Sequence, residues 1–228
     1  LGNFLSLATL QGLNYILPLL TLPYLVRVLG AEKFGLIAFA TAVVGYFIVL
    51  TDYGFNFSAT REVANHRDDK NKLVEIFSSV MIIKVLLLLI SFVILLFLII
   101  SFEKIGTDAL LYILTFGSVV GQVLFPVWFF QGVERMKYIT IINIISKTIF
   151  TVAIFLLVKQ TSDYLLVPIL TSVGIIVASL ISLYIVFFNF KVKFKFQKIA
   201  TITQYLKGGL SLLYTSAMSN LFTSLGVI

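Results

Sequence analysis

Long apolar stretches separated by short polar segments make up most of the chain. One stretch, 138–158, is interrupted only by Lys147. The stretches without any charged residue are 1–26, 34–51, 85–102, 110–133, 164–190 and 208–228. Each is roughly 18 to 27 residues long, and a helix rising about 1.5 Å per residue needs about 20 residues to cross the hydrocarbon core of a bilayer. The pattern therefore predicts seven membrane-spanning helices, whereas strands of a membrane barrel would be about half as long.

Composition agrees with a polytopic membrane protein built from α-helices. Of the 228 residues, 60% are hydrophobic and 12% are charged, and the mean hydropathy is +1.08. A soluble domain has about half apolar and about a quarter charged residues, so a water-soluble fold could not bury this much apolar surface. The chain begins with Leu1 rather than Met and is still uncharged at Ile228, so we expect a fragment of a longer protein.

The positive charge of the chain is concentrated in the loops. The net charge is +7, but the basic residues do not gather on one soluble face, so we expect no nucleic acid partner. The loops after the second, fourth and sixth stretches carry Arg61, Arg67, Lys70, Lys72, Arg135, Lys137, Lys191, Lys193, Lys195, Lys198 and Lys207. The loops after the first, third and fifth carry Arg27, Lys33, Lys104 and Lys159. Because Lys and Arg collect in cytoplasmic loops, we expect the larger group, and with it the N-terminus, in the cytoplasm.

Signatures of catalysis are missing from the sequence. It contains no HExxH, GxGxxG or phosphate-loop motif and no cluster of carboxylates within an apolar stretch. The absence of Cys excludes disulfides, thiolate metal sites and a Cys nucleophile in this segment. We therefore expect a protein that is not an enzyme, with no catalytic residue, no metal and no cofactor.

Three charged residues fall inside the predicted helices: Asp52, Lys84 and Lys147. Each lies about nine residues, or roughly 13 Å, from the expected cytoplasmic end of its helix. A charge in lipid costs several kcal/mol, so charged residues at this depth are candidates for function. They could line a polar chamber open to the cytoplasm. Alternatively, Asp52 pairs with one lysine while the other extends its amine to the interface.

Amide side chains accompany these charges in or near the helices: Gln11, Asn14, Asn56, Gln122, Gln131 and Asn143. An amide facing lipid would lack hydrogen-bond partners, so all of them should face protein. Taken singly, each is expected to join two helices; taken as a set, they could line a path for a polar, anionic cargo.

Three local features refine the picture. Gly117 and Gly121 form a GxxxG pattern, which predicts a close approach between two helices. Pro126 removes a backbone hydrogen bond within the fourth helix. Basic and apolar residues alternate in 191–196, which suits either contact with anionic lipid headgroups or an ordinary solvated orientation signal.

Three blocks of sequence carry a resemblance to a known family. They are NYILPLLTLPYLVRVLG at 14–30 with EKFGL at 32–36, DYGFN at 52–56 with ATRE at 59–62, and WFFQG at 128–132 with Glu134. With these blocks the chain resembles, over essentially its whole length, the Wzx-type O-antigen and polysaccharide flippases. That family is part of the superfamily that also contains multidrug exporters and the peptidoglycan lipid flippase.

The resemblance implies a transporter with two pseudo-symmetric lobes. Residues 1–190 would form the N-terminal lobe, with six transmembrane helices at about 3–28, 34–59, 76–101, 108–132, 138–158 and 163–190. Residues 191–207 would be a basic cytoplasmic linker between the lobes. Residues 208–228 would begin the seventh helix, in a C-terminal lobe that is truncated here.

The resemblance also implies a function in the bacterial inner membrane. An undecaprenyl-pyrophosphate-linked oligosaccharide would move from the cytoplasmic to the outer leaflet by alternating access, with a polysaccharide polymerase and a chain-length regulator as further partners. Arg27, Arg61, Lys84 or Lys147 would meet the pyrophosphate; Arg27 and Arg61 stand at family motif positions, whereas Lys84 and Lys147 are candidates from their depth alone. The amides of Asn14, Asn56, Gln122, Gln131 and Asn143 would meet sugar hydroxyls. Asp52 would pair with a lysine or bind a coupling ion.

Two other functions stay open from the sequence. One is export of a drug or of another lipid-linked precursor by a member of the same superfamily. The other is a membrane subunit of a polysaccharide synthesis complex that does not itself transport.

Overall fold

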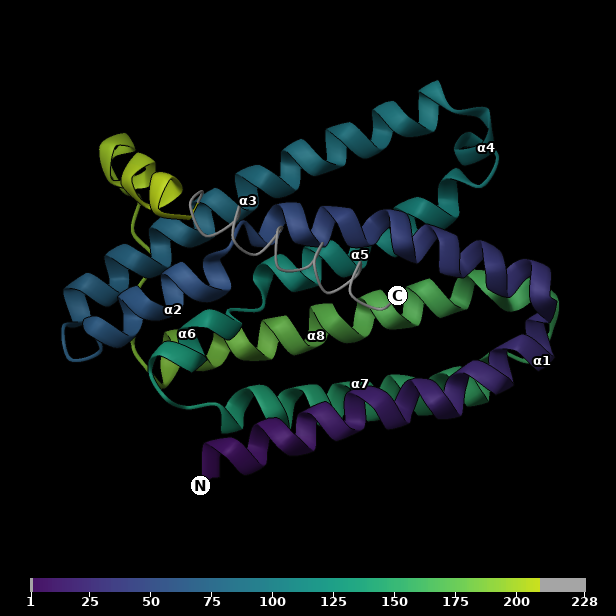
Figure 1. Cartoon of the computed structure of the whole chain (residues 1–228), viewed down its shortest axis with the longest axis horizontal. Coiled ribbons are helices and arrows are strands. Elements are labelled where there is room, and N and C mark those ends of the chain that lie inside the picture. The colour runs from purple at the N-terminus through teal and green to yellow at the C-terminus, as the bar shows by residue number, and fades with distance from the viewer. Residues whose placement is uncertain (1, 210–228) are drawn as a thin grey trace, which may run out of the picture.

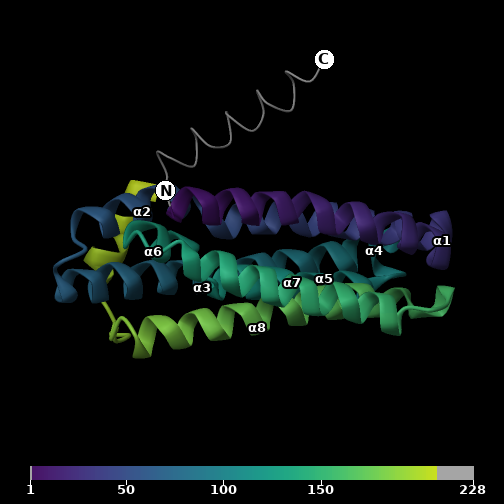
Figure 2. The same cartoon turned by 90° about the horizontal axis from the view of Figure 1, so that it is seen from below.

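The computed structural model describes residues 2–209, with side chains from Leu19 onward, and this part of the chain is helical without strands. The elements in chain order are α1 Gly2–Asp52, α2 Phe55–Asn65, α3 Lys70–Ser101, α4 Glu103–Gly106, α5 Ala109–Leu124, α6 Val127–Gly132, α7 Lys137–Leu157, the 3-10 helix η1 Thr161–Leu165, and α8 Leu166–Phe188. Residues 199–209 are helical as well. The long helices run roughly parallel or antiparallel to one another and form a bundle (Figures 1 and 2).

The helix α1 contains two limbs joined at Gly30. Gly30 has φ 77° and ψ 162°, a conformation that residues with a side chain rarely adopt, and the helix reverses direction there (Figure 1). The hydroxyl of Tyr24 donates a hydrogen bond of 2.7 Å to the carbonyl oxygen of Val158, which ties the first limb to the end of α7. The loop predicted between the first two helices is therefore reduced to a single non-helical residue.

Five ranges of the described residues are long and apolar enough to cross a membrane: Leu19–Asn65, Lys70–Ser101, Ala109–Gly132, Lys137–Leu157 and Thr161–Phe188. The first of them includes the bend at Gly30, so it joins the end of the first predicted helix to the second. The predicted seventh helix, 208–228, lies outside the described residues except for its first two positions. An all-α polytopic membrane protein is confirmed.

Two of the predicted helices are interrupted. The helix expected over 34–59 ends at Asp52, because Tyr53 and Gly54 have φ values of 49° and 76°, and α2 starts after them. The helix expected over 108–132 ends at Leu124. The residue before Pro126 is extended, as the proline ring requires, and α6 begins after the proline. The break at Tyr53–Gly54 was not predicted, whereas Pro126 had marked the position of the second one.

Close packing between α5 and α8 confirms the prediction made from the GxxxG pattern. A Cβ on Gly117 would lie 2.8 Å from the Cβ of Ser172, and one on Gly121 would lie 2.5 Å from Cγ2 of Ile175. The hydroxyl of Ser172 donates a hydrogen bond of 2.8 Å to the carbonyl oxygen of Leu114. Only glycine lets the two backbones approach this closely.

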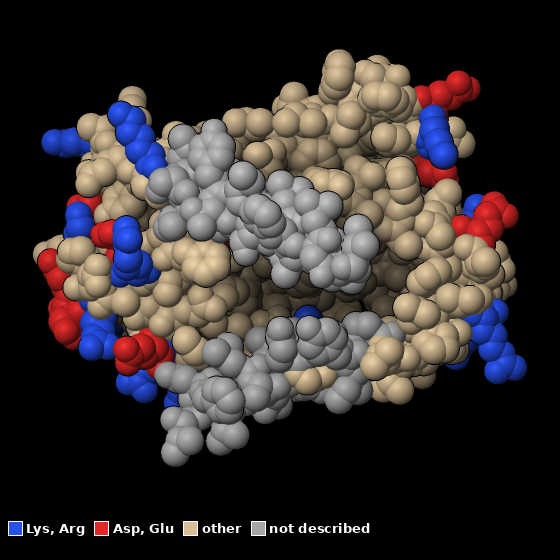
Figure 3. All heavy atoms as spheres, in the orientation of Figure 1, with Lys and Arg blue, Asp and Glu red and all other residues tan. Residues whose placement is uncertain are grey.

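Most charged side chains on the face shown in Figure 3 lie at the two ends of the bundle, and the band between them is almost entirely uncharged. One end is formed by α2, α6, the end of α8 and residues 189–209 (Figure 1). It carries the larger group of basic residues counted in the sequence, and we call it the basic end. The other end holds the bend at Gly30, α4 and η1 (Figures 1 and 2). The loops that the sequence assigned to one side of the membrane therefore lie together in the structure.

Candidate functional site: a buried ion pair beside a helix break

The break between α1 and α2 places a carboxylate at the C-terminal end of a helix. Asp52 is the last residue of α1, where the unsatisfied carbonyl groups give the helix end a partial negative charge. The backbone of the break is held by local bonds, since the N–H of Tyr53 donates to the carbonyl of Val49 and the N–H of Ser58 donates to the carbonyl of Gly54. A carboxylate at this position needs a positive partner to offset both its burial and the helix dipole.

Lys84 is that partner. Its Nζ lies 3.9 Å from Oδ1 of Asp52, and the lysine side chain is only 4% exposed while that of Asp52 is 28% exposed. The side chain of Asn56, one turn into α2, also makes a hydrogen bond with the carboxylate. The ion pair joins the end of α1 to the middle of α3, and the amide connects it to α2. Of the charged residues predicted inside the helices, the structure thus brings Asp52 and Lys84 together.

The second helix break lies close to the first. Thr60 in α2 has its hydroxyl 3.2 Å from the carbonyl oxygen of Trp128 and 3.4 Å from Oε1 of Gln131, both in α6. A Cβ on Gly132 would lie 2.5 Å from the Cβ of Val63, so α2 and α6 are in direct backbone contact. Gln131 therefore belongs to the same end of the bundle as Asn56, and the two interrupted helices form one packed unit.

Arg61 lies in a small polar pocket on the basic end. The pocket has a volume of about 220 Å³ and is lined by residues of α2, the start of α3 and the helix 199–209. They are Phe55, Ser58, Ala59, Arg61, Glu62, Lys72, Gln204, Tyr205 and Gly208. Arg61 itself is exposed and follows Asp52 by nine positions. It therefore lies at the solvent-exposed side of the site, which we call its mouth, rather than beside the buried pair.

The remaining predicted site residues are not gathered at the ion pair. Arg27 precedes the bend at Gly30 and lies at the opposite end of the bundle, roughly 33 Å from Asp52 along the second limb of α1. Asn143 donates its amide to the carbonyl of Ile139 in its own helix, at 2.9 Å. Gln122 is half-buried in α5, and Lys147 is exposed on α7. The side chain of Asn14 lies outside the described residues.

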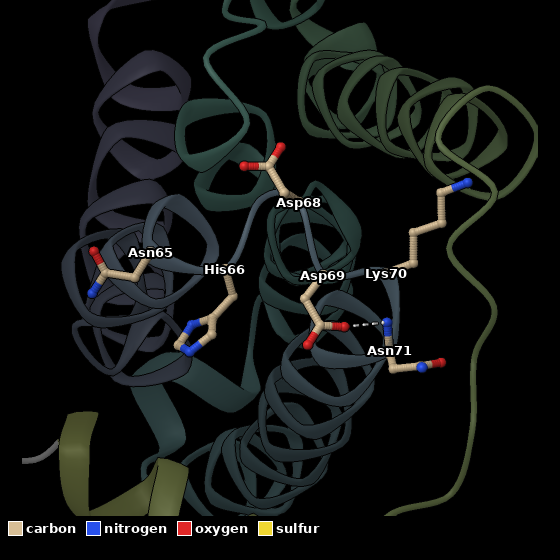
Figure 4. Close-up of a pocket in the computed structure, with 6 residues that line it drawn as sticks. All are labelled: Asn65, His66, Asp68, Asp69, Lys70 and Asn71. Atoms are coloured by element: carbon tan, nitrogen blue, oxygen red, sulfur yellow. Dashed lines mark hydrogen bonds between the residues drawn. The ribbon is translucent and has the colours of Figure 1, made fainter.

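A larger hollow of about 640 Å³ lies in the loop between α2 and α3. It is lined by Asn65, His66, Asp68, Asp69, Lys70 and Asn71 (Figure 4). Asp69 accepts hydrogen bonds from the backbone N–H groups of Asn71 and Lys72 and so caps the start of α3. Because Asp69 serves the helix cap and the hollow is open to solvent, this loop is a structural feature distinct from the ion pair.

A polar network that the sequence did not indicate fastens the helix 199–209 to α3. The hydroxyl of Tyr205 donates a hydrogen bond of 3.2 Å to Oε1 of Glu75, which also accepts from Nζ of Lys72 at 2.7 Å. Burial raises the pKa of Tyr205 to about 12, so its hydroxyl stays protonated as a donor. Positions 75 and 205 are 130 residues apart, and no local pattern marks such a pair.

Comparison with known proteins identifies the family of the chain. The family described as polysaccharide biosynthesis protein matches residues 1–228. The chain belongs to this family. A protein of Escherichia coli (strain K12) named "Putative O-antigen transporter" is 37% identical over 184 residues, which cover 81% of this chain and 44% of that protein. A protein of the same name from Shigella dysenteriae is 29% identical over 194 residues, covering 81% and 46%.

The chain thus spans less than half the length of these curated relatives of the polysaccharide biosynthesis family. No solved structure matches it. Membership confirms the resemblance found in the sequence, and the apolar helices agree with a multi-pass membrane protein.

Proposed function

We propose that this chain is a membrane-embedded lobe of an exporter for lipid-linked oligosaccharide. The substrate is an undecaprenyl-pyrophosphate-linked repeat unit of O-antigen or another surface polysaccharide, which crosses from the cytoplasmic to the outer leaflet of the bacterial inner membrane by alternating access. The observation that carries the proposal is the buried pair of Asp52 and Lys84 beside the break between α1 and α2. Buried ion pairs seldom add stability and intramembrane charges are rare, so their presence favours a role in binding or gating.

The chemistry of the site suits an anionic cargo with a polar head. Lys84, when released from Asp52, and Arg61 at the mouth offer cations to a pyrophosphate. Asn56 and Gln131 offer amides to sugar hydroxyls. Both lie in short helices that follow a helix break, and the substrate-binding sites of many transporters are built at such breaks. Asp52 would hold Lys84 in the empty state or take up a coupling ion. Arg27 lies at the other end of the bundle, so it would contact the substrate only in a conformation that is open at that end.

Complementation of a deletion strain tests this function. We expect Lys84→Ala to abolish surface polysaccharide while the protein still reaches the membrane. Lys104→Ala, at an exposed lysine on the opposite end, should export normally. Since Lys84→Ala leaves Asp52 without its cation, the neutral pair Asp52→Asn with Lys84→Met is assayed in parallel, and it too should insert without exporting. Normal polysaccharide in both variants would disprove the proposed site.

The same deletion strain distinguishes polysaccharide export from drug export. A drug exporter would change the sensitivity of the deletion strain to toxic compounds and leave the surface polysaccharide intact. We expect the opposite result, with polysaccharide lost and drug sensitivity unchanged.

A further inference from the structure

The segment 191–198, between α8 and the helix 199–209, is basic and has no acidic partner among the described residues. Lys191, Lys193, Lys195 and Lys198 are all exposed, and no Asp or Glu follows Asp163 in the sequence. The ion pairs formed within residues 19–209 involve none of these lysines. The charge of the segment is therefore not balanced by the part of the protein that the structure describes.

The apolar residues of this segment become more exposed along the chain, from a buried first residue to a last one on the surface. Val192 is 3% exposed and packs in the core cluster formed by α2, α3, α6, α7 and α8. Phe194 is 44% exposed and Phe196 is 91% exposed. Their rings contact each other edge to face, with centroids 5.6 Å apart, and Ile199 beyond them is 83% exposed. Large apolar side chains this exposed call for a covering surface.

A hydrogen bond to α3 fixes the level of the segment along the bundle. The backbone N–H of Lys195 donates to Oγ of Ser78 at 3.0 Å. The span predicted for α3, 76–101, puts the hydrocarbon boundary near Ile76. Ser78 is two residues, or roughly 3 Å, from that boundary, next to the lipid headgroups. The helix α8 ends at Phe188, just before the segment, and so agrees with this level.

We propose that residues 191–199 bind anionic phospholipid. The lysines contact lipid phosphates, while Phe194, Phe196 and Ile199 enter the boundary between headgroups and acyl chains. The charge of the segment favours anionic lipid as its ligand, because an unbalanced cluster of lysines at headgroup depth attracts an anionic surface. Aromatic residues also prefer that interface. The proposal requires only that the bundle lies in a membrane, so it stands independently of the export activity.

Fluorescence quenching in proteoliposomes tests the contact. The complete protein, with any cysteine elsewhere replaced, carries one new cysteine, either Phe196→Cys or Asp68→Cys, labelled with an environment-sensitive fluorophore. This chain contains no Cys, so the labelled position is unique within it. Asp68 is the matched control, since it is exposed at the same end but lies ahead of α3, about 15 Å beyond Ser78. The vesicles are phosphatidylcholine alone or mixed with phosphatidylglycerol, each with a quencher attached to lipid at headgroup depth.

The label at 196 should be quenched about threefold more strongly than the label at 68. Its quenching should rise with the phosphatidylglycerol content and fall when Lys193, Lys195 and Lys198 are all changed to Gln. Equal, weak quenching at both positions would overturn the proposal, because the aromatic pair would then lie in water or against protein. Quenching at 196 that ignores both the phosphatidylglycerol content and the lysines would also overturn it, because the contact would then be apolar and not headgroup-specific.

Discussion

Gly132 of α6 lies directly against Val63 of α2. A Cβ on the glycine would be 2.5 Å from Cβ of the valine and 2.9 Å from the carbonyl oxygen of Thr60. This contact joins the two short helices that follow the breaks at Tyr53–Gly54 and Phe125–Pro126. The helices α2 and α6 are therefore packed as one unit, and the position of this unit relative to α1 bears on the ion pair of Asp52.

Gly132→Ala should destabilise the protein. The added methyl group has no room against Val63 or the backbone of Thr60, and overpacking of this kind costs about 1–3 kcal/mol. The thermal midpoint of the purified protein in detergent should fall by several degrees. Gly35→Ala is the control, because a Cβ there meets nothing within 4 Å and alanine favours the helix. An equal midpoint for the two variants would contradict the tight contact.

The ion pair should behave as a coupled unit in a double-mutant cycle. Lys84→Met alone leaves the carboxylate of Asp52 without its cation, and Asp52→Asn alone leaves a buried ammonium. Each single variant should lower the free energy of unfolding by about 3 kcal/mol or somewhat less, because Asp52 is partly exposed. The double variant should recover most of that loss. Thermal or denaturant unfolding in detergent measures the three variants, and simple additivity of the single effects would show that the two groups do not interact.

The sequence predicted the apolar helices well because each is defined by its own residues. Run length marks a span, and GxxxG marks a close contact, without knowledge of the neighbours. The break at Tyr53–Gly54 was missed, since Gly54 stands inside a stretch that reads as helical to position 59. Its position three residues after the end of the uncharged run 34–51 could have been taken as a helix end.

Partners in space were harder to predict than elements. Depth along the helices placed Asp52, Lys84 and Lys147 alike, but only the rotation of each helix decides which side chains meet. That rotation depends on packing, such as the contact between Gly121 and Ile175, which no single segment encodes. Arg27 is far from the ion pair for a different reason: it lies at the opposite end of the bundle, in a loop that the sequence had already assigned to the other side of the membrane.

Removal of one hydroxyl should loosen the helix 199–209. Tyr205→Phe loses the hydrogen bond to Glu75, which should cost about 1 kcal/mol. Burial raises the pKa of Tyr205 from 10.0 to about 12, so the stabilising effect of the protonated hydroxyl is complete below pH 10 and is lost as the pH rises toward 12. Hydrogen exchange of residues 199–209 should therefore be faster in the variant at pH 7. Thr203→Ala, on an exposed side chain of the same helix, is the control, and equal exchange in both variants would rule out the role of the Tyr205 hydroxyl.

The orientation of the bundle follows from which end carries the basic residues, and accessibility can test it. The loop between α2 and α3 lies at the basic end, while α4 and Thr107 lie at the other (Figure 1). Because Lys and Arg favour cytoplasmic loops, we expect Asp68→Cys to react with a membrane-impermeant maleimide only after the inner membrane is opened. Thr107→Cys should react in cells whose inner membrane is intact. Both positions are exposed, so folding should be preserved. The reverse labelling pattern would place the basic end, with Asp52, Lys84 and the segment 191–199, outside the cytoplasm and would reverse the direction of entry proposed for the substrate.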